Sequence, residues 1–375
     1  MKLHFDVGLC VRAKSKFSNC EKCVHAAPES IKMQENLPSF KVSTGVEAAA
    51  CVGVCPTEAL SLSDFSTTEF FFTFLESKVR LISPKLNVPC ISVLSVEHLI
   101  SLALASDEPV VLDLASYDAE SHVLEQIEAR IEEANFVLSS FSDKQLETNV
   151  DEDISVEKNE SSQEGTRRDF LASASIKGAL KHKKAFDDAV DAEELQLFEI
   201  GDDVIAKIKD KQLPNKRKIL FTTLKRAGVP DVFEVLPEEE VSFTSQKFVD
   251  ESCTNCQICY RICPTGALTT DKKFSLINFD AMLCVKCRLC HDVCEPNAIQ
   301  LQPSYEIKEF FEPAQRTLAT FDIKRCNECG NPFTYKGGIL ECPRCKEEED
   351  EAIFLHQNAK RMEKALEEKE KSEEE

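Results

Sequence analysis

Eight cysteines between positions 253 and 294 repeat one spacing twice, and their thiols are the side chains of this chain best suited to chemistry. Each run has the pattern C-x2-C-x2-C-x3-C. The first run consists of Cys253, Cys256, Cys259 and Cys263, and the second of Cys284, Cys287, Cys290 and Cys294. Thiolates are soft ligands that hold iron–sulfur clusters, and a loop with such short steps can wrap several corners of one cluster. The pattern therefore predicts iron–sulfur chemistry.

Residues 249–301 resemble a two-cluster bacterial ferredoxin domain, because the two runs and the sequence Cys-Pro-Thr-Gly-Ala-Leu at 263–268 are typical of that family. In this family each run gives three thiolates to one [4Fe–4S] cluster and its fourth thiolate to the other. The resemblance implies cluster I on Cys253, Cys256, Cys259 and Cys294, and cluster II on Cys284, Cys287, Cys290 and Cys263.

The second run departs from the family pattern, because Glu295 separates Cys294 from Pro296. This change alters a turn but removes no ligand. Zinc knuckles are the competing interpretation of the whole segment, since paired CxxC steps also suit tetrahedral zinc. A zinc knuckle would leave the third and fourth cysteines of each run without a role, so the cluster interpretation is favoured.

An incomplete copy of the same pattern stands near the N-terminus. One half is reduced to a CxxC pair at 20–23, followed by Ala27 where a full motif has cysteine. The other half keeps its C-x3-C-P end at 51–56, but Gly45 and Ala48 occupy its two earlier ligand positions. The resemblance therefore extends to a degenerate ferredoxin-like domain with a single cluster.

The ligands of this N-terminal cluster can be assigned in two ways. The exchange of fourth ligands between halves implies Cys10, Cys20, Cys23 and Cys55, and leaves Cys51 without a role. The alternative set replaces Cys10 by Cys51 and ignores that exchange. A cysteine-rich remnant that binds no metal is a third interpretation.

Two further CxxC pairs lie towards the C-terminus, separated by 12 residues that include the pair Gly337-Gly338. They consist of Cys326, Cys329, Cys342 and Cys345. Two such knuckles can hold one tetrahedral ion between two hairpin turns, as in a zinc ribbon. Rubredoxins bind one iron with similar knuckles, but space them much further apart. The sequence therefore favours zinc over iron here.

Cysteine usage and charge limit the compartment and the partners. Eighteen cysteines in 375 residues could form a disulfide scaffold, but their CxxC grouping favours metal binding in a reducing compartment, so we expect a cytoplasmic protein. The first ten residues lack the apolar stretch of a signal peptide, so we expect none, and no apolar run approaches the roughly 20 residues that span a bilayer. The net charge of −21 argues against nucleic acid as a partner. It suits docking on a basic patch of a redox enzyme, although solubility alone also explains it.

The remaining sequence predicts an α+β multidomain chain. Apolar runs rich in β-formers predict strands at 69–75, 90–94 and 110–114, and helical spacing predicts helices at 96–105 and 117–138. This alternation favours a small α/β layer with a parallel sheet. Lone Cys90 and His98 within it are expected to be structural. No glycine-rich phosphate loop is present, so the layer gives no sign of binding a dinucleotide or ATP.

Between the two halves, acidic and serine-rich residues predict a flexible linker. A twin-arginine string at 166–171 resembles an export motif, but its internal position favours a helix start. The predicted order is a degenerate single-cluster ferredoxin-like domain (1–64), an α/β domain (65–142), the linker (143–165), a helical segment (166–240), a two-cluster ferredoxin domain (241–303), a zinc-ribbon-like domain (304–346) and a charged helical tail (347–375).

The whole arrangement resembles the multi-cluster ferredoxin-like proteins of anaerobic and microaerophilic bacteria. These are often linked to formate dehydrogenases, hydrogenases or other molybdenum enzymes, which implies transfer of single electrons at low potential to or from such an enzyme or its electron-transfer subunit. The sequence has no nucleophile–base pair and no open catalytic metal site, so we expect a carrier without its own substrate site. The alternatives are a maturation or assembly factor for a metalloenzyme and, less favoured without a helix-turn-helix, a redox-sensing regulator.

Overall fold

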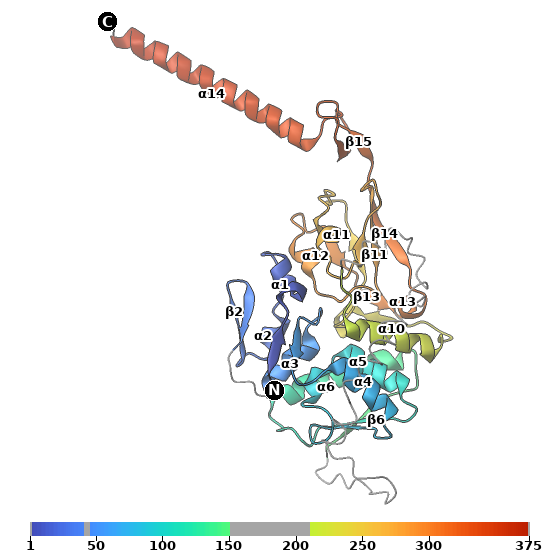
Figure 1. The fold of residues 1–375 in the computed structure, drawn as a ribbon. Coiled ribbons are helices and arrows are strands. Elements are labelled where there is room, and N and C mark those ends of the chain that lie inside the picture. Colours follow the sequence, from blue (N-terminus) through green and yellow to red (C-terminus); the bar gives the residue numbers. More distant parts are fainter. Residues whose placement is uncertain (1, 41–45, 151–210, 374–375) are drawn as a thin grey trace, which may run out of the picture.

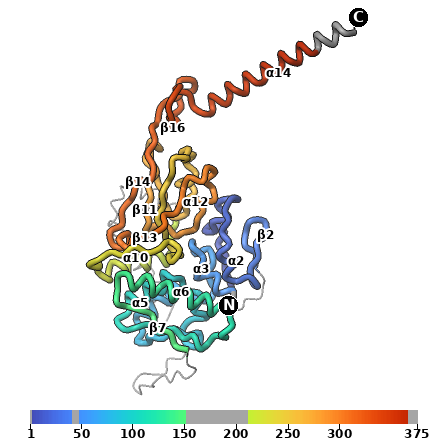
Figure 2. Tube along the Cα trace, turned by 180° about the vertical axis from the view of Figure 1, so that it is seen from behind, coloured from blue at the N-terminus to red at the C-terminus, as the bar shows by residue number. Residues whose placement is uncertain are grey.

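The computed structural model describes residues 2–40, 46–150 and 211–373 of the chain. An N-terminal unit, an α/β layer and a cysteine-rich unit form one body, and a small C-terminal unit with a long helix extends away from it (Figures 1 and 2). The export-like string at 166–171, the predicted linker beyond residue 150 and the predicted helical stretch up to residue 210 lie outside the described residues.

The N-terminal unit consists of two antiparallel strand pairs and short helices. Its elements are β1 (Leu3–Phe5), α1 (Val11–Lys14), α2 (Lys22–Ala26), β2 (Ile31–Gln34), β3 (Leu37–Phe40), α3 (Val46–Val54) and β4 (Leu60–Leu62). Strand β1 pairs with β4, and β2 pairs with β3. Glu35 and Asn36 join β2 to β3 with φ of 49° and 77°, because a tight two-residue hairpin turn requires the left-handed conformation.

The α/β layer follows directly. Its elements are α4 (Thr67–Glu76), β5 (Leu81–Ile82), the 3-10 turn η2 (Ile91–Val93), α5 (Val96–Ala105), β6 (Val110–Asp113), α6 (His122–Ser139) and β7 (Leu146–Asn149). The three strands form a parallel sheet with β6 in the middle, which is the predicted sheet type. Helix α5 forms at the predicted position, whereas α6 begins five residues later than predicted; Ser95 and Ser121 cap their N-termini.

Three expectations for this layer are wrong. The run at 69–75 is the helix α4, because the Ser66 hydroxyl accepts a hydrogen bond from the Glu69 N–H at 3.2 Å and caps it. Phe70 and Phe74 then lie one turn apart and are both buried. The run at 90–94 contains the 3-10 turn η2 instead of a strand. Strand β7 lies within the range predicted as linker, where it pairs with β6.

The cysteine-rich unit begins after residue 210. Its elements are α10 (Asn215–Ala227), β8 (Val235–Pro237), β9 (Lys247–Val249), α11 (Ile258–Ile262), β10 (Leu268–Thr269), β11 (Leu276–Asp280), α12 (Leu289–Asp292), β12 (Ile299–Leu301), β13 (Ser304–Glu306), α13 (Lys308–Phe311) and β14 (Gln315–Thr320). Strands β9 and β12 pair antiparallel, as do β8 and β13. The order β9-α11-β10-β11-α12-β12 repeats the order β1-α2-β2-β3-α3-β4 of the N-terminal unit, with the same pairing of the outer strands.

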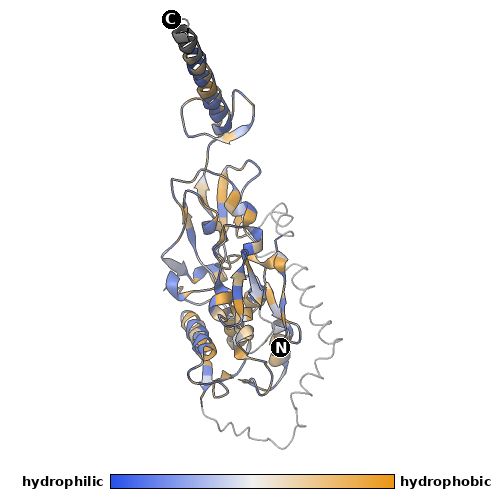
Figure 3. Ribbon diagram, turned by 90° about the vertical axis from the view of Figure 1, so that its left-hand side faces the viewer, coloured by the Kyte–Doolittle hydropathy of each residue, from blue (hydrophilic) through white to orange (hydrophobic). Residues whose placement is uncertain are grey.

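The C-terminal unit is smaller than predicted. It contains the hairpin of β15 (Ile323–Arg325) and β16 (Pro332–Thr334), followed by the helix α14 (Pro343–Glu373). The predicted boundary at residue 304 is wrong, because β14 pairs with β11 and so belongs to the body. Helix α14 begins with a proline, which is favourable at a first helical position, and carries hydrophilic residues along much of its length (Figure 3). Within the described residues, no helix is both long and apolar enough to cross a membrane.

One continuous hydrophobic core joins the α/β layer to the cysteine-rich unit. Helix α10 packs against α5, and its buried side chains Ile219, Leu220 and Leu224 belong to the same core as Leu99 of α5. The two regions were predicted as separate domains. Their shared core instead holds the cysteine-rich unit rigidly against the layer, since close-packed interiors resist relative movement.

Candidate metal centres

The four cysteines expected at cluster I surround a single cavity. The cavity is lined by Cys253, Cys256, Cys259 and Cys294 together with apolar side chains. Cys253 and Cys256 come from the loop before α11 and Cys259 from α11 itself, whereas Cys294 follows α12. The fold therefore brings the last cysteine of the second run to the first run, 35 positions beyond Cys259 in the sequence.

The two cysteine loops have the same unusual backbone conformation. Asn255 and Gln257, on either side of Cys256, have φ of 56° and 71°. Lys286 and Arg288, on either side of the equivalent Cys287, have φ of 44° and 61°. Left-handed residues of this kind turn backbone N–H groups towards one point and create an anion-binding nest, which is common at iron–sulfur sites. Both loops thus suit a cluster that is negatively charged through its thiolates.

The turn after the last cysteine of each run is also repeated. Gly266 follows Cys263 by three positions with φ of 77°, and Asn297 follows Cys294 by three positions with φ of 51°. Glu58 has φ of 53° at the same position after the N-terminal Cys55. The change at Glu295 that was expected to alter this turn therefore leaves the left-handed third residue in place.

The cysteines expected at cluster II interact with one another in a largely buried group. Burial raises the pKa of Cys287, and the neighbouring thiols of Cys263, Cys290 and Cys284 raise it further. Burial likewise raises the pKa of Cys290 to about 12, with Cys284 and Cys263 adding to the effect. The raised pKa values favour the protonated thiols of Cys287 and Cys290, so a metal that binds here must displace their protons and supply the positive charge. Cys263 reaches this group from the first run.

A buried lysine lies beside the cluster II cysteines. Lys247 is 3% exposed, and its Nζ lies 2.9 Å from His291 Nε2. Burial lowers the pKa of Lys247, but the thiols of Cys284, Cys290, Cys287 and Cys263 outweigh burial and raise it. In the described part of the chain no carboxylate forms an ion pair with Lys247. Sequence reasoning missed this residue, because a single lysine in a strand before the first run carries no motif.

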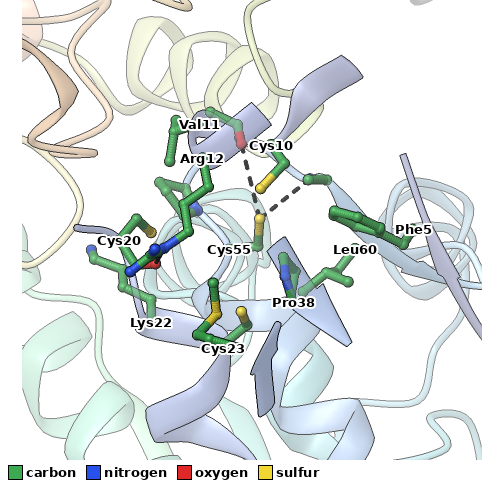
Figure 4. A pocket seen from close by; sticks show the side chains of 14 residues that line it. Phe5, Cys10, Val11, Arg12, Cys20, Lys22, Cys23, Pro38, Cys55 and Leu60 are labelled. Carbon is green, nitrogen blue, oxygen red and sulfur yellow. Dashed lines mark hydrogen bonds between the residues drawn. The ribbon is translucent and has the colours of Figure 1, made fainter. Parts of the chain in front are cut away.

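The N-terminal cysteines also surround a cavity (Figure 4). Cys10, Cys20, Cys23 and Cys55 are among the residues that line it. Burial raises the pKa of Cys23 to about 12, and the thiols of Cys55, Cys20 and Cys10 contribute in that order. Arg12 stabilises the backbone of the site, because its Nε donates a hydrogen bond to the Cys20 carbonyl at 2.6 Å. Cys51 is not among the lining residues; its Sγ donates to the Ala48 carbonyl at 2.7 Å inside α3.

The place of the second N-terminal cluster is filled by packed side chains. Ala27, Ala48 and Cys51 are all buried, while Gly45 lies outside the described residues. Helix α3 has nine residues where its counterpart α12 has four, so a helix replaces much of the loop that would wrap a cluster. The helix packs tightly on the α/β layer: a Cβ at Gly53 would lie 2.5 Å from the Ser92 carbonyl oxygen.

The C-terminal cysteines converge much more closely. The Sγ atoms of Cys326, Cys329, Cys342 and Cys345 lie within 4.8 Å of one another, and those of Cys329 and Cys342 are 3.7 Å apart. Tetrahedral zinc with Zn–S bonds of about 2.3 Å needs sulfur atoms about 3.8 Å apart. The pKa of Cys326 is lowered to about 6 by hydrogen bonds from the N–H of Cys329 and then of Cys342, which favours the thiolate that a metal binds.

This close spacing separates the C-terminal site from the other three. Among the residues that the structure describes, no other three His, Cys, Asp or Glu side chains bring their ligand atoms within 4.8 Å of one another. The remaining cysteine groups are therefore too widely spaced to share a single ion, which fits a cluster of several metal atoms and argues against zinc knuckles in these places.

Comparison with known proteins identifies one segment of the chain. The model of a 4Fe-4S dicluster domain family matches residues 252–299, which confirms the predicted ferredoxin-type iron–sulfur domain in this region. The match covers both cysteine runs and a small part of the whole chain. Searches of curated proteins and of solved structures found no significant match.

Proposed function

We propose that this protein carries single electrons at low potential to or from a redox enzyme, such as a formate dehydrogenase or a hydrogenase. The observation that carries this proposal is the dicluster domain at 252–299, in which Cys294 joins Cys253, Cys256 and Cys259 around one cavity. A [4Fe–4S] cluster bound there supplies reversible one-electron chemistry.

We assign a set of cysteines to each centre. Cluster I takes Cys253, Cys256, Cys259 and Cys294; cluster II takes Cys284, Cys287, Cys290 and Cys263; the N-terminal cluster takes Cys10, Cys20, Cys23 and Cys55; zinc takes Cys326, Cys329, Cys342 and Cys345. The repeated strand and helix order supports a degenerate ferredoxin domain at the N-terminus. The 3.7 Å sulfur separation supports zinc at the ribbon, where it would hold together a unit too small to fold alone.

The residues around each cluster hold it in place and adjust its potential. The left-handed loops at Asn255–Gln257 and Lys286–Arg288 aim N–H groups at cluster sulfur, which stabilises the more negative, reduced state. The buried ammonium of Lys247 acts in the same direction at cluster II. Apolar side chains such as Ile277 and Ile299 exclude water from cluster I. This exclusion acts in the opposite direction, because it destabilises the more negative, reduced state of the cluster.

Docking of a partner enzyme is proposed at the cluster I end of the body. Cys256 is exposed, whereas Cys284 and Cys290 at cluster II are buried, so an external enzyme can approach cluster I most closely. The net charge of −21 favours a partner with a basic patch and a salt-dependent encounter. We expect the complex with the partner enzyme to be weak and transient, as is usual for electron-transfer proteins.

Metal analysis and redox titration test the proposal. Anaerobically purified protein should contain about twelve iron atoms, about twelve sulfides and about one zinc per chain, as three cubanes and a ribbon require. Dithionite should reduce it and a low-potential dye should reoxidise it fully, with signals of reduced [4Fe–4S] clusters in low-temperature EPR. A protein that binds iron but cannot be reduced and reoxidised reversibly would not be an electron carrier.

A maturation or assembly factor for a metalloenzyme is the second candidate. It is favoured by the helix α14, which extends from the body and exposes Ile353, Phe354 and Leu355, a feature that a simple carrier does not need. Pull-down distinguishes the two roles. A factor should prefer the immature apo-enzyme, whereas a carrier should bind the mature enzyme in a salt-sensitive manner.

A further inference from the structure

The N-terminal unit contacts the two-cluster domain through a small apolar cluster of its own. Val11, the residue after Cys10, is 2% exposed and packs with Leu289 and Val293. Cys20 of the N-terminal site and Cys287 of cluster II both pack against this cluster. Two cysteines from different candidate metal sites therefore pack against the same three side chains.

Hydrogen bonds hold this contact in register. The Asn19 N–H donates to Asp292 Oδ2 at 2.9 Å, and the Asn19 side-chain amide donates to Asp292 Oδ1 at 3.4 Å. Asp292 belongs to α12, the same short helix that contains Leu289 and Cys290. The contact thus joins the loop before Cys20 directly to the helix that carries a cluster II cysteine.

The other side of cluster II faces cluster I. Helices α11 and α12 pack together, with Cys259 in the first and Cys290 in the second. The thiols of Cys259 and Cys290 are close enough to interact electrostatically. Cluster II therefore has Cys287 directed towards the N-terminal site and Cys290 towards cluster I.

We infer that the three clusters form one line with cluster II in the middle, and that Val11, Leu289 and Val293 are the junction through which the N-terminal cluster exchanges electrons with cluster II. This inference rests on the proposed carrier function. In each step one electron leaves a reduced cluster and enters its oxidised neighbour, and no bond or proton changes. Because the rate of electron tunnelling falls steeply with distance, the direct apolar contact favours this route. The electrons enter and leave through the partner enzymes.

Lys22 places a positive charge at this junction. It follows Cys20 by two positions and lines the N-terminal cavity (Figure 4). Its Nζ lies 3.4 Å from the Ser242 carbonyl of the cysteine-rich unit. The ammonium interacts electrostatically with both Cys20 and Cys287. A single lysine therefore acts on two clusters that belong to different halves of the chain.

Redox titration of Lys22→Gln, followed by low-temperature EPR, tests the junction. Loss of the positive charge should make the potentials of the N-terminal cluster and of cluster II both more negative, and should change cluster I least. The matched control is Lys32→Gln, which removes an exposed lysine from β2 of the same unit and should leave all three potentials unchanged. A shift at only one of the two clusters, or the same result in both variants, would overturn the inference.

Magnetic interaction supplies a second test. Cys23→Ala removes a ligand of the N-terminal cluster, so the EPR signal of reduced cluster II should relax more slowly in this variant while that of cluster I stays the same. An unchanged cluster II signal would show that the two centres are not neighbours. An iron content of about eight atoms in the wild-type protein would also overturn the inference, yet leave a two-cluster carrier intact. Failure of reversible reduction in the wild type would instead refute the carrier function itself.

Discussion

Arg217 and Glu97 form an ion pair in the middle of the core, with 2.8 Å between Nε and Oε1 and side chains that are 0% and 1% exposed. The other guanidinium nitrogens of Arg217 donate to the carbonyl oxygens of Met282 at 2.9 Å and Phe243 at 2.7 Å. Lys216 gives Glu97 a second cation at 3.2 Å. Helix α10 therefore ties α5 of the α/β layer to the loop that leads into Cys284.

Replacing Arg217 with methionine should destabilise the body by about 3 kcal/mol or more, because it leaves buried carbonyl groups and part of the Glu97 charge without a partner. Chemical unfolding, followed by the visible absorbance of the clusters and by far-UV circular dichroism, measures the loss. Arg226→Met is the control, since Arg226 lies exposed on the same helix. Equal stability of the two variants would contradict a structural role for the pair.

Acid should weaken the fold through His98. This side chain is 3% exposed, and burial lowers its pKa to about 4, with Lys216 adding to the effect. The unfolded chain binds a proton at His98 below a pH of about 6.5, whereas the folded chain does so only near pH 4. Stability from this group is therefore complete above pH 6.5 and is lost as the pH falls towards 4, by up to about 3 kcal/mol.

The measurement is the unfolding free energy of wild type and of His98→Asn between pH 7.5 and pH 4. In the wild type the Ser95 N–H donates a hydrogen bond to His98 Nδ1 at 3.3 Å. The asparagine side chain keeps an acceptor near this N–H. It does not titrate, so its stability should fall less steeply in this range. Parallel curves for the two proteins would mean that His98 contributes nothing to acid sensitivity.

Removing the charge of Lys247 should make cluster II harder to reduce. Lys247→Met keeps the side-chain volume but deletes the buried ammonium beside the thiols, so the potential should fall by on the order of 100 mV. Potentiometric titration with EPR detection measures it. Lys273→Met, at an exposed position in the same domain, should have no comparable effect. If both variants retain the wild-type potential, the counter-charge of cluster II must come from elsewhere.

Cys263→Ser should damage cluster II and spare cluster I, although Cys263 follows the cluster I cysteines in the sequence. The reason is the electrostatic contact of Cys263 with Cys287 and Cys290. EPR of the reduced variant, together with iron analysis, identifies the cluster that is lost. Loss of the cluster on Cys253, Cys256 and Cys259 would refute the exchanged assignment.

At the N-terminal site, Cys10→Ser should lose about four iron atoms and Cys51→Ser should lose none. Cys10 lines the cavity, whereas Cys51 is buried in α3 with its thiol bonded to the Ala48 carbonyl. Iron and sulfide analysis of both variants distinguishes the two ligand sets. The opposite outcome would support the alternative ligand set with Cys51.

The sequence by itself determined the features that depend on short separations. Cysteine steps of three or four positions identified the iron–sulfur segment at 252–299, because the ligands of one loop must lie close together in the chain. Regular apolar spacing likewise located α5 and α6. It failed at 69–75, where a run of phenylalanines suits either a strand or a helix and the Ser66 cap decides for the helix.

Only the tertiary structure decided which distant residues meet. Arg217 lies 120 positions from Glu97, and Asn19 lies 273 positions from Asp292, yet both pairs are within hydrogen-bond distance. No local periodicity encodes such contacts, because they result from how whole units pack. The same holds for Lys247, whose charge acquires a role only when strand β9 is packed beside the cluster II cysteines. Local spacing thus predicts the candidate metal sites, and long-range packing decides which other residues surround them.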